Sequence, residues 1–339
     1  MTKSNNRFIP DKPFRNYDQQ ILLLKSRGLI IKNENLAKHQ LKTYSYYDLI
    51  NGNLDKLMAS RHPDHFNDGV TMNNLVQIRI IEDRIKSVFL QQILMIERTF
   101  KSTLSYYISE HYGVDSNPGG YLSKSNYSST RSRIVTRTMK TLRNICDGNV
   151  GNKIQGAPIK YYRKNHNHIP PWILVDELTL GETIYWFRGI NGSGKKSISA
   201  EMLHLPSSLS TAQQLEVFQT TIDIIREFRN LFAHNSVLSH MSSRRELNIL
   251  LLGDPITNAN LVSDLENNAA NSHNLVACFL SILVLSNDYD QLGIFLAEFE
   301  QTISVLDGDS QKFIIEDIFH FPLFLITHGK VFAEKLVLT

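Results

Sequence analysis

"MNNLVQIRIIEDRIKSVFLQQILMIERTFKSTLSYYISEHY", residues 72–112, is the stretch that decides the fold of this chain. Its apolar side chains recur at steps of three and four: Leu75, Ile78, Ile81, Ile85, Phe89, Ile93, Ile96, Phe100, Leu104 and Ile108. That spacing gathers them on one side of a helix. Gly113 and then "NPGG" (117–120) supply the residues that end helices. The sequence therefore predicts one long amphipathic helix over 72–112.

Helical periodicity continues on both sides of this stretch. Residues 17–31 carry a helical apolar pattern that stops at Gly28, a residue type that commonly terminates helices. Ser210 and Gln213 have the spacing of a capping box at the start of another helix. The remaining predicted helices cover residues 33–50, 129–145, 209–232, 275–299 and 313–325. We therefore expect an all-α chain with no sheet larger than a hairpin.

The predicted helices also define a domain organisation. Residues 1–16 are expected to be an N-terminal tail, 17–245 a helical domain, and 246–339 a C-terminal helical segment packed on that domain. No internal repeat divides the chain further. A chain of 339 residues is long enough to bury a sizeable core in such an arrangement.

Composition excludes several classes of function. Apolar residues make up 42% and charged residues 20%, as in ordinary soluble proteins. The net charge is only +3, so nucleic-acid affinity must come from local basic patches. Cys146 and Cys278 form no C-x-x-C pair, which argues against a disulfide scaffold or a cysteine-built zinc site. We expect neither a metal nor another cofactor.

Location is indicated by what the apolar segments lack. The start, "MTKSNNRFIPDKPF", has no apolar core of a signal peptide. The longest apolar runs, such as "LVACFLSILVL" (275–285), are shorter than the roughly 18 residues of a membrane span. These features predict a cytoplasmic protein without membrane contact.

"RGINGSGKKSIS" (188–199) is similar to the phosphate-binding loop of nucleotide hydrolases. Gly189, Gly194 and Lys195 have the spacing of that loop, but Lys196 stands where a hydroxyl must bind Mg²⁺. The preceding segment has a helical rather than a strand pattern, and no later aliphatic run ends in Asp. We expect no nucleotide site here, but a flexible connection that exposes both lysines as candidate RNA contacts.

"REFRNLFAHNSV" (226–237) is the constellation that fits chemistry. A His takes or returns protons near neutral pH, and an Arg forks onto a phosphate and stabilises its developing charge. Arg229 and His234 are thus candidates for metal-independent RNA cleavage, with Asn230 orienting either partner. In an ideal helix, side chains five positions apart differ by about 140° in direction. A shared site therefore requires distortion near Ala233 or a contribution from another element.

Alternatives to this site remain open at the level of sequence. Arg163 and His168 have the same spacing but run into two prolines, and Arg143 is followed by Asn144 with Gly148 at the His position. Spacing alone also permits Arg229 and His234 to be a helix-end pair that satisfies backbone carbonyls. A second basic feature lies elsewhere: Arg133, Arg137 and Lys140 share one face of the 129–145 helix, as either a phosphate track or a solvated face.

"FRNLFAHNS" (228–236) resembles the R-N-x-x-x-H motif of HEPN-domain ribonucleases, which lies near the end of a helix in an all-α bundle. The wider chain resembles the bacterial abortive-infection Abi family, of the AbiD/AbiF kind, from about residue 12 to residue 240. The matching segments, in order, are "KPFRNYDQQILLLKSRGLII", "YSYYDLI", "LMIERTFKSTLSYYISEHYG", "APIKYYRKNHNHIPPWILVDELTLGETIYWF" and "REFRNLFAHNS". The chain departs from many relatives, which have "C-A-H-H", by its Phe232 and by Asn235 after the single His234.

The resemblance implies a HEPN-like bundle and an anti-phage toxin that cleaves RNA. It implies that Arg229 and His234 are catalytic and that Asn230 supports them. With one such motif in each chain, a composite site would be formed by a homodimer. Some relatives lie beside a structured non-coding RNA, so a cognate RNA is an expected partner besides the substrate. The alternatives are a non-cleaving RNA-binding ribonucleoprotein component and a purely structural helical protein.

Overall fold

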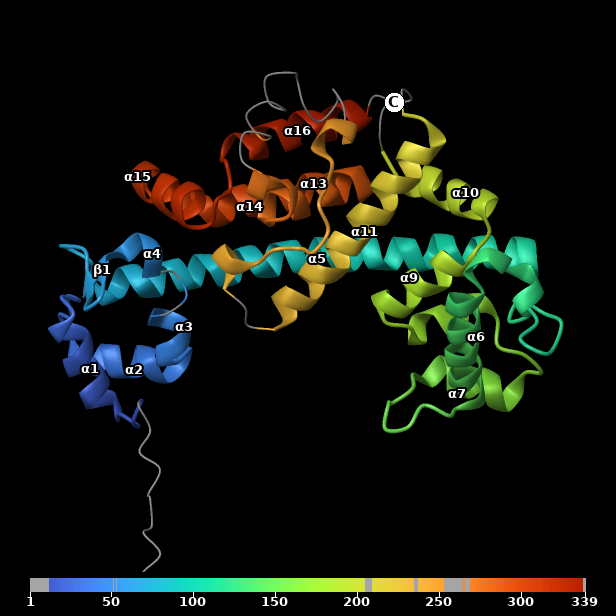
Figure 1. Cartoon of the computed structure of the whole chain (residues 1–339), viewed down its shortest axis with the longest axis horizontal. Helices are drawn as coiled ribbons and strands as arrows, with labels where there is room; N and C mark the ends of the chain where they lie inside the picture. The colour runs from blue at the N-terminus through green and yellow to red at the C-terminus, as the bar shows by residue number, and fades with distance from the viewer. Residues whose placement is uncertain are drawn as a thin grey trace, which may run out of the picture.

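The long helix predicted from the apolar stripe spans the whole molecule. The computed structural model describes residues 12–50, 52, 54–204, 209–234, 237–252, 265 and 269–337. In it, α5 covers Met72–Tyr112, from a capping box between Thr71 and Asn74 to Gly113, whose φ is 78°. All ten residues of the stripe are buried. Figure 1 shows α5 as a horizontal axis with helical layers above and below it.

The N-terminal elements lie around the start of α5 (Figure 1). They are α1 (Tyr17–Ser26), α2 (Glu34–Tyr44), α3 (Tyr46–Ile50), α4 (Leu54–Leu57), β1 (Met58–Arg61) and β2 (Asp64–Phe66). The single helix predicted over 33–50 is two helices, because Ser45 adopts a φ of 63° between them. Strands β1 and β2 pair antiparallel and are the one sheet in the described part of the chain.

The middle of the chain forms the second group of helices, at the other end of α5 (Figure 1). They are α6 (Ser132–Asp147), α7 (Ala157–Asn165), α8 (Pro171–Leu174), α9 (Leu180–Gly189), α10 (Gly192–Met202) and α11 (Thr211–Ala233), with short 3₁₀ turns at Lys124–Asn126, Ser129–Arg131 and Val175–Glu177. Helix α11 begins with the predicted capping box of Ser210 and Gln213. It crosses α5 and carries the candidate residues at its far end.

The C-terminal helices form a layer on α5 and α11. Their elements are η4 (Leu238–His240), η5 (Ile249–Leu252), η6 (Ala269–Ser272), α13 (Leu275–Leu285), α14 (Tyr289–Ser304), α15 (Gly308–Gln311), the π-helical η7 (Lys312–Ile318) and α16 (Phe324–Val337). Every residue of α13 is buried, since it packs against α11 and α5 beneath α16. Helix α14 packs along α5, and α16 packs on α14.

The prediction of an all-α fold is confirmed. The described residues form helices apart from turns, loops and the small β1–β2 hairpin. Over the same residues, none of the helices combines the length and apolar character that crossing a bilayer requires.

Candidate functional site

Helix α11 places Arg229, Asn230 and His234 at its C-terminal end. Its apolar side, which includes Phe228 at 0% exposure, is buried, so the opposite side faces outward. Asn230 and His234 are exposed and Arg229 is partly exposed. The helix ends at Ala233, and His234 has φ −110° and ψ 86°. Because the chain leaves helical geometry at His234, the angular separation of an ideal helix does not apply to this pair.

The backbone of His234 closes the helix. Its N–H donates to the carbonyl oxygens of Asn230 at 3.1 Å and Leu231 at 3.3 Å. These bonds hold the last turn together without using the imidazole. The side chain is therefore not required for the helix end itself.

Helix α5 adds two residues to this site that the sequence analysis did not identify. Glu97 Oε2 lies 3.7 Å from Arg229 Nε, and Glu97 Oε1 lies 3.1 Å from Lys101 Nζ. The Glu97 side chain is only 10% exposed, against 40% for that of Arg229. Neither Glu97 Oε2 nor Arg229 Nε has a hydrogen-bond partner among the described residues, so charge alone joins them. The sequence does place Glu97 and Lys101 at i, i+4 spacing, which allows an ion pair on one helix face.

The arrangement combines three chemical capacities. Arg229 supplies a permanent cation with donors arranged for a phosphate, and Lys101 supplies a second positive charge nearby. His234 supplies an imidazole, the side chain that most often acts as a general acid or base. Glu97 lies beneath both cations and restrains the position of Arg229. Residues of these types can bind a phosphodiester and move a proton beside it.

The competing Arg163–His168 pair has a structural role instead. Arg163 Nε donates to the Cys146 carbonyl at 2.6 Å, and Arg163 Nη2 donates to the Ile145 carbonyl at 2.8 Å and to Gln155 Oε1 at 2.8 Å. The guanidinium thereby binds two carbonyl groups in the last turn of α6, where helical carbonyls lack some of their usual partners.

Arg143 of the other partial match is likewise engaged in structure. Its Nη2 donates to the carbonyl of Leu122 at 3.0 Å. Neither alternative motif forms a site comparable to the end of α11.

The segment similar to a phosphate-binding loop is not a loop. Residues 192–202 form α10, capped by Asn191, whose Oδ1 accepts from the N–H of Gly194 at 2.8 Å. The prediction of a flexible connection with two exposed lysines is wrong for Lys195, which is 7% exposed, whereas Lys196 is exposed. Burial lowers the pKa of the Lys195 ammonium, and the positive charge of Arg131 lowers this pKa further. Lys195 therefore cannot act as an RNA contact at the surface.

The close packing of α10 on α5 explains why residue 194 is a glycine. A Cβ at Gly194 would lie 2.5 Å from Tyr107 Oη and 2.5 Å from Ile190 Cγ2, so α10 approaches α5 closely here. The glycine serves helix packing rather than phosphate binding.

We expect Gly194→Ala to lower the free energy of unfolding by about 1–3 kcal/mol, since overpacking forces neighbours to shift. Gly192→Ala is the matched control, because a Cβ at Gly192 meets nothing within 4 Å. That control should be neutral or stabilise by up to ~1 kcal/mol. Urea unfolding of both variants measures the difference. Equal stability of the two would contradict the packing role of Gly194.

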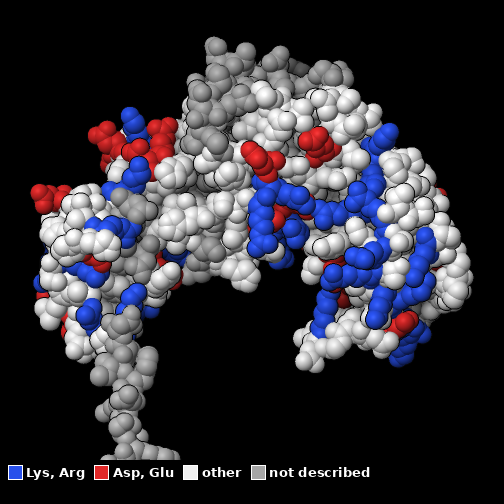
Figure 2. Space-filling view, viewed as in Figure 1, with Lys and Arg blue, Asp and Glu red and all other residues white. Residues whose placement is uncertain are grey.

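The predicted basic residues of α6 lie at the surface. Arg133, Arg137 and Lys140 are exposed, while the buried side of α6 packs on α9. Arg137 also approaches the ring of Tyr185, with Cζ 5.9 Å from the ring centroid. Figure 2 shows Lys and Arg side chains gathered over the centre and right of this face, beside a hollow at its lower edge.

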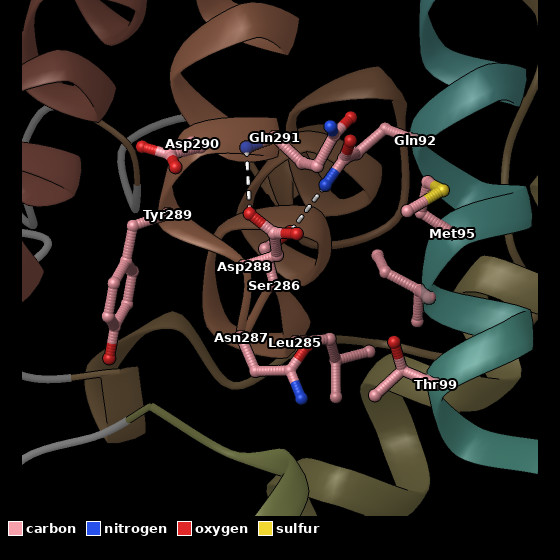
Figure 3. Close-up of a pocket in the computed structure, with 11 residues that line it drawn as sticks. Gln92, Met95, Thr99, Leu285, Ser286, Asn287, Asp288, Tyr289, Asp290 and Gln291 are labelled. Atoms are coloured by element: carbon pink, nitrogen blue, oxygen red, sulfur yellow. Dashed lines mark hydrogen bonds between the residues drawn. The ribbon is translucent and has the colours of Figure 1, made fainter. Parts of the chain in front are cut away.

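Another cavity has none of the candidate site residues in its lining. It has a volume of about 570 Å³ and is lined by Gln92, Ser286, Asp288 and neighbouring residues (Figure 3). Its polar groups are engaged in structure: Gln92 donates to Ser286 Oγ at 2.9 Å, and Asp288 accepts from the Gln291 N–H at 3.0 Å. Across the described ranges, no three His, Cys, Asp or Glu side chains are grouped closely enough to hold a metal ion. The cavity thus presents no second catalytic constellation.

The fold and the site together describe an all-helical protein in which α11 ends at an exposed His234, five residues after an arginine in ion contact with Glu97 of α5. The chain belongs to the Abi-like protein family, whose family model matches residues 39–240. The matched region includes Glu97, Lys101, Arg229, Asn230 and His234. Comparison with curated proteins gives no match, and comparison with solved structures gives none either.

Proposed function

We propose that this protein is a metal-independent endoribonuclease of the HEPN type that acts in abortive-infection defence. The observation that carries the proposal is the ion contact of 3.7 Å between Arg229 and the largely buried Glu97, five residues before an exposed His234. Membership of the Abi-like family supports the role in defence. The resemblance of residues 228–236 to the R-N-x-x-x-H motif of HEPN-domain ribonucleases supports the proposed RNA cleavage.

In the proposed reaction, the RNA provides its own nucleophile. His234 takes the proton from a 2′-OH, and the resulting oxygen attacks the adjacent phosphorus. The bond from phosphorus to the 5′-oxygen breaks, which leaves a 2′,3′-cyclic phosphate and a 5′-OH end. Arg229 stabilises the charge that develops on the phosphoryl oxygens. Asn230 orients the reacting groups, and Glu97 with Lys101 positions Arg229.

Returning a proton to the 5′-oxygen requires an acid. We propose that a second copy of the chain supplies it, so that a composite site forms across a two-fold axis. A cleaving species with the mass of a dimer by light scattering supports this assembly, and a cleaving monomer contradicts it.

The test is cleavage of a labelled single-stranded RNA by the purified protein, with and without EDTA. We expect products ending in a 2′,3′-cyclic phosphate at the same rate in both conditions, because the mechanism uses only side chains. Arg229→Ala should abolish cleavage and weaken RNA binding. Arg229→Lys is the matched control, which keeps the charge but loses the planar fork and should recover cleavage only partly. Products with a 3′-OH, or loss of activity in EDTA, would contradict the mechanism.

The alternative function is RNA binding without cleavage. The exposed Arg133 and Arg137 of α6 and the partly exposed Arg188 of α9 favour an RNA partner, whether or not the protein cleaves RNA. Tight RNA binding with no cleavage under any condition would support this alternative over the nuclease.

A further inference from the structure

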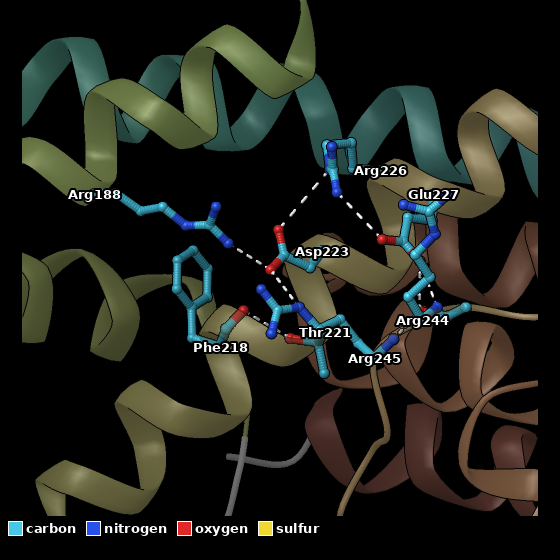
Figure 4. A network of polar contacts seen from close by, with 9 residues as sticks. Arg188, Phe218, Thr221, Asp223, Arg226, Glu227, Arg244 and Arg245 are labelled. Atoms are coloured by element: carbon cyan, nitrogen blue, oxygen red, sulfur yellow. Dashed lines mark hydrogen bonds and ion pairs between the residues drawn. The ribbon is translucent and has the colours of Figure 1, made fainter. Parts of the chain in front are cut away.

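Three arginines converge on one buried carboxylate on the face of α11 nearest α9. Arg188 Nη2 and Arg245 Nε lie 2.5 Å and 3.1 Å from Asp223 Oδ2, and Arg226 Nε lies 3.9 Å from Asp223 Oδ1. The Asp223 side chain is 3% exposed. Figure 4 shows the three guanidinium groups approaching Asp223 from different directions. They come from α9, α11 and the segment after η4, so the fold builds this cluster from separate parts of the chain.

A second carboxylate fixes the segment that carries Arg244 and Arg245. Glu227 Oε2 accepts from the Arg244 N–H at 2.7 Å and from Ser243 Oγ at 2.9 Å, while Oε1 accepts from Arg226 Nη2 at 3.2 Å. This segment is thereby tied to α11.

The arginine cluster, defined as Arg188, Arg226, Arg244 and Arg245, carries excess positive charge. Its four guanidinium groups outnumber the carboxylates of Asp223 and Glu227 by two. The side chains of Arg188, Arg226 and Arg245 are 20%, 33% and 54% exposed, so each is in contact with solvent. A buried ion pair adds little net stability compared with apolar side chains of similar volume. The arrangement instead holds mutually repelling cations together at the surface, where an anion can bind them.

An exposed aromatic ring adjoins the cluster. Tyr185 is 42% exposed, and the Cζ atoms of Arg137 and Arg188 lie 5.9 Å and 5.8 Å from its ring centroid. A pocket of about 270 Å³ beside it is lined by Arg137, Tyr185, Gly181 and further residues of α6 and α9. A Cβ at Gly181 would lie 3.7 Å from Arg226 Cδ, so the pocket and the cluster are neighbours.

We propose that the arginine cluster and Tyr185 form a binding site for an unpaired stretch of nucleic acid. The guanidinium groups fork onto successive phosphates, and an unpaired base stacks beside Tyr185. A base within a duplex cannot stack in this way, so the site selects unpaired strands. Arg226 and Arg229 are on the same helix, less than one turn apart. This inference rests on the proposed function, because it takes the bound strand to be the substrate RNA held beside the cleavage site.

The test uses the full-length His234→Ala protein, so that binding is measured without turnover. Its probe is a fluorescein-labelled single-stranded 20-nucleotide RNA, read by anisotropy. Arg244→Gln/Arg245→Gln should weaken binding by ~10-fold or more and reduce the salt slope by about 1.4, at about 0.7 for each phosphate contact. Lys32→Gln/Arg84→Gln is the matched control, because it removes the same charge from exposed positions outside the cluster. It should leave the affinity nearly unchanged.

A further pair of variants keeps the test valid if removing Arg245 disturbs Asp223. Arg137→Gln removes a charge beside Tyr185 and should weaken binding by several-fold. Tyr185→Ala should lower the affinity for single-stranded RNA but not the affinity for duplex RNA. Tyr185→Phe keeps the aromatic ring and should retain both affinities. Equal effects of Tyr185→Ala on both RNAs would overturn the selection of unpaired strands.

Two comparisons separate this inference from the proposed function. If Arg244→Gln/Arg245→Gln and Arg137→Gln both leave the RNA affinity unchanged while the wild-type protein cleaves RNA, the binding site is excluded and the nuclease proposal stands. Absence of wild-type cleavage, with arginine-dependent binding intact, overturns the nuclease and leaves the site. The arginine variants should also bind a single-stranded DNA of the same sequence more weakly, because both polymers offer phosphates and bases. If these variants lost affinity for the DNA but not for the RNA, the assignment of the site to RNA would be overturned.

Discussion

Replacement of Phe89 by alanine is expected to lower the free energy of unfolding by about 3–5 kcal/mol. Phe89 lies in the middle of α5 and is 0% exposed. Its ring centroid is 5.2 Å from that of Phe295, 5.1 Å from that of Phe299 and 6.1 Å from that of Phe232, each in an edge-to-face arrangement. One side chain thus joins α5, α11 and α14. Its removal leaves a cavity at their junction.

The measurement is urea unfolding followed by circular dichroism. Phe89→Met approximately conserves volume and should cost less than ~1.5 kcal/mol. Leu94→Ala is a control on the same helix at a side chain that is 44% exposed, and it should have little effect. If Phe89→Ala costs no more than Phe89→Met, the C-terminal helices do not share a core with α5. Phe232 lies two residues before His234, so this core also supports the candidate site.

The central helix could be predicted from sequence because its information is local. The apolar pattern of this 41-residue helix needs no distant partner to be recognised, and Gly113 marks its end. The break at Ser45 could not be predicted in this way. Its φ of 63° is uncommon for serine, and no glycine or proline announces it.

Helix α10 shows the opposite case, in which packing overrides local preference. "GSGKKS" has low helix propensity, so the sequence indicates a turn. The close approach of Gly194 to Tyr107 and the burial of Lys195 show that contact with α5 stabilises the helix. Glu97 was missed for a related reason, since its pairing with Arg229 joins residues far apart in the chain.

His234→Ala is expected to reduce the rate of RNA cleavage by about 10²–10⁴-fold, the usual contribution of a general acid or base. Folding should be unaffected for a structural reason. The bonds that close α11 at this position come from the His234 backbone, which alanine retains, and the side chain is exposed. RNA affinity should also persist, because the phosphate contacts are assigned to arginines.

Single-turnover cleavage rates, an unfolding curve and RNA anisotropy together test this prediction. His168→Ala is the matched control, since His168 has the same spacing from an arginine but lies where Arg163 is engaged with backbone carbonyls. It should cleave like the wild type. In cells, His234→Ala should end the growth arrest, or abolish the protection against phage, while the protein is expressed at an unchanged level. A soluble His234→Ala protein that remains fully toxic excludes the proposed mechanism, and one that unfolds shows that the imidazole stabilises the helix end instead.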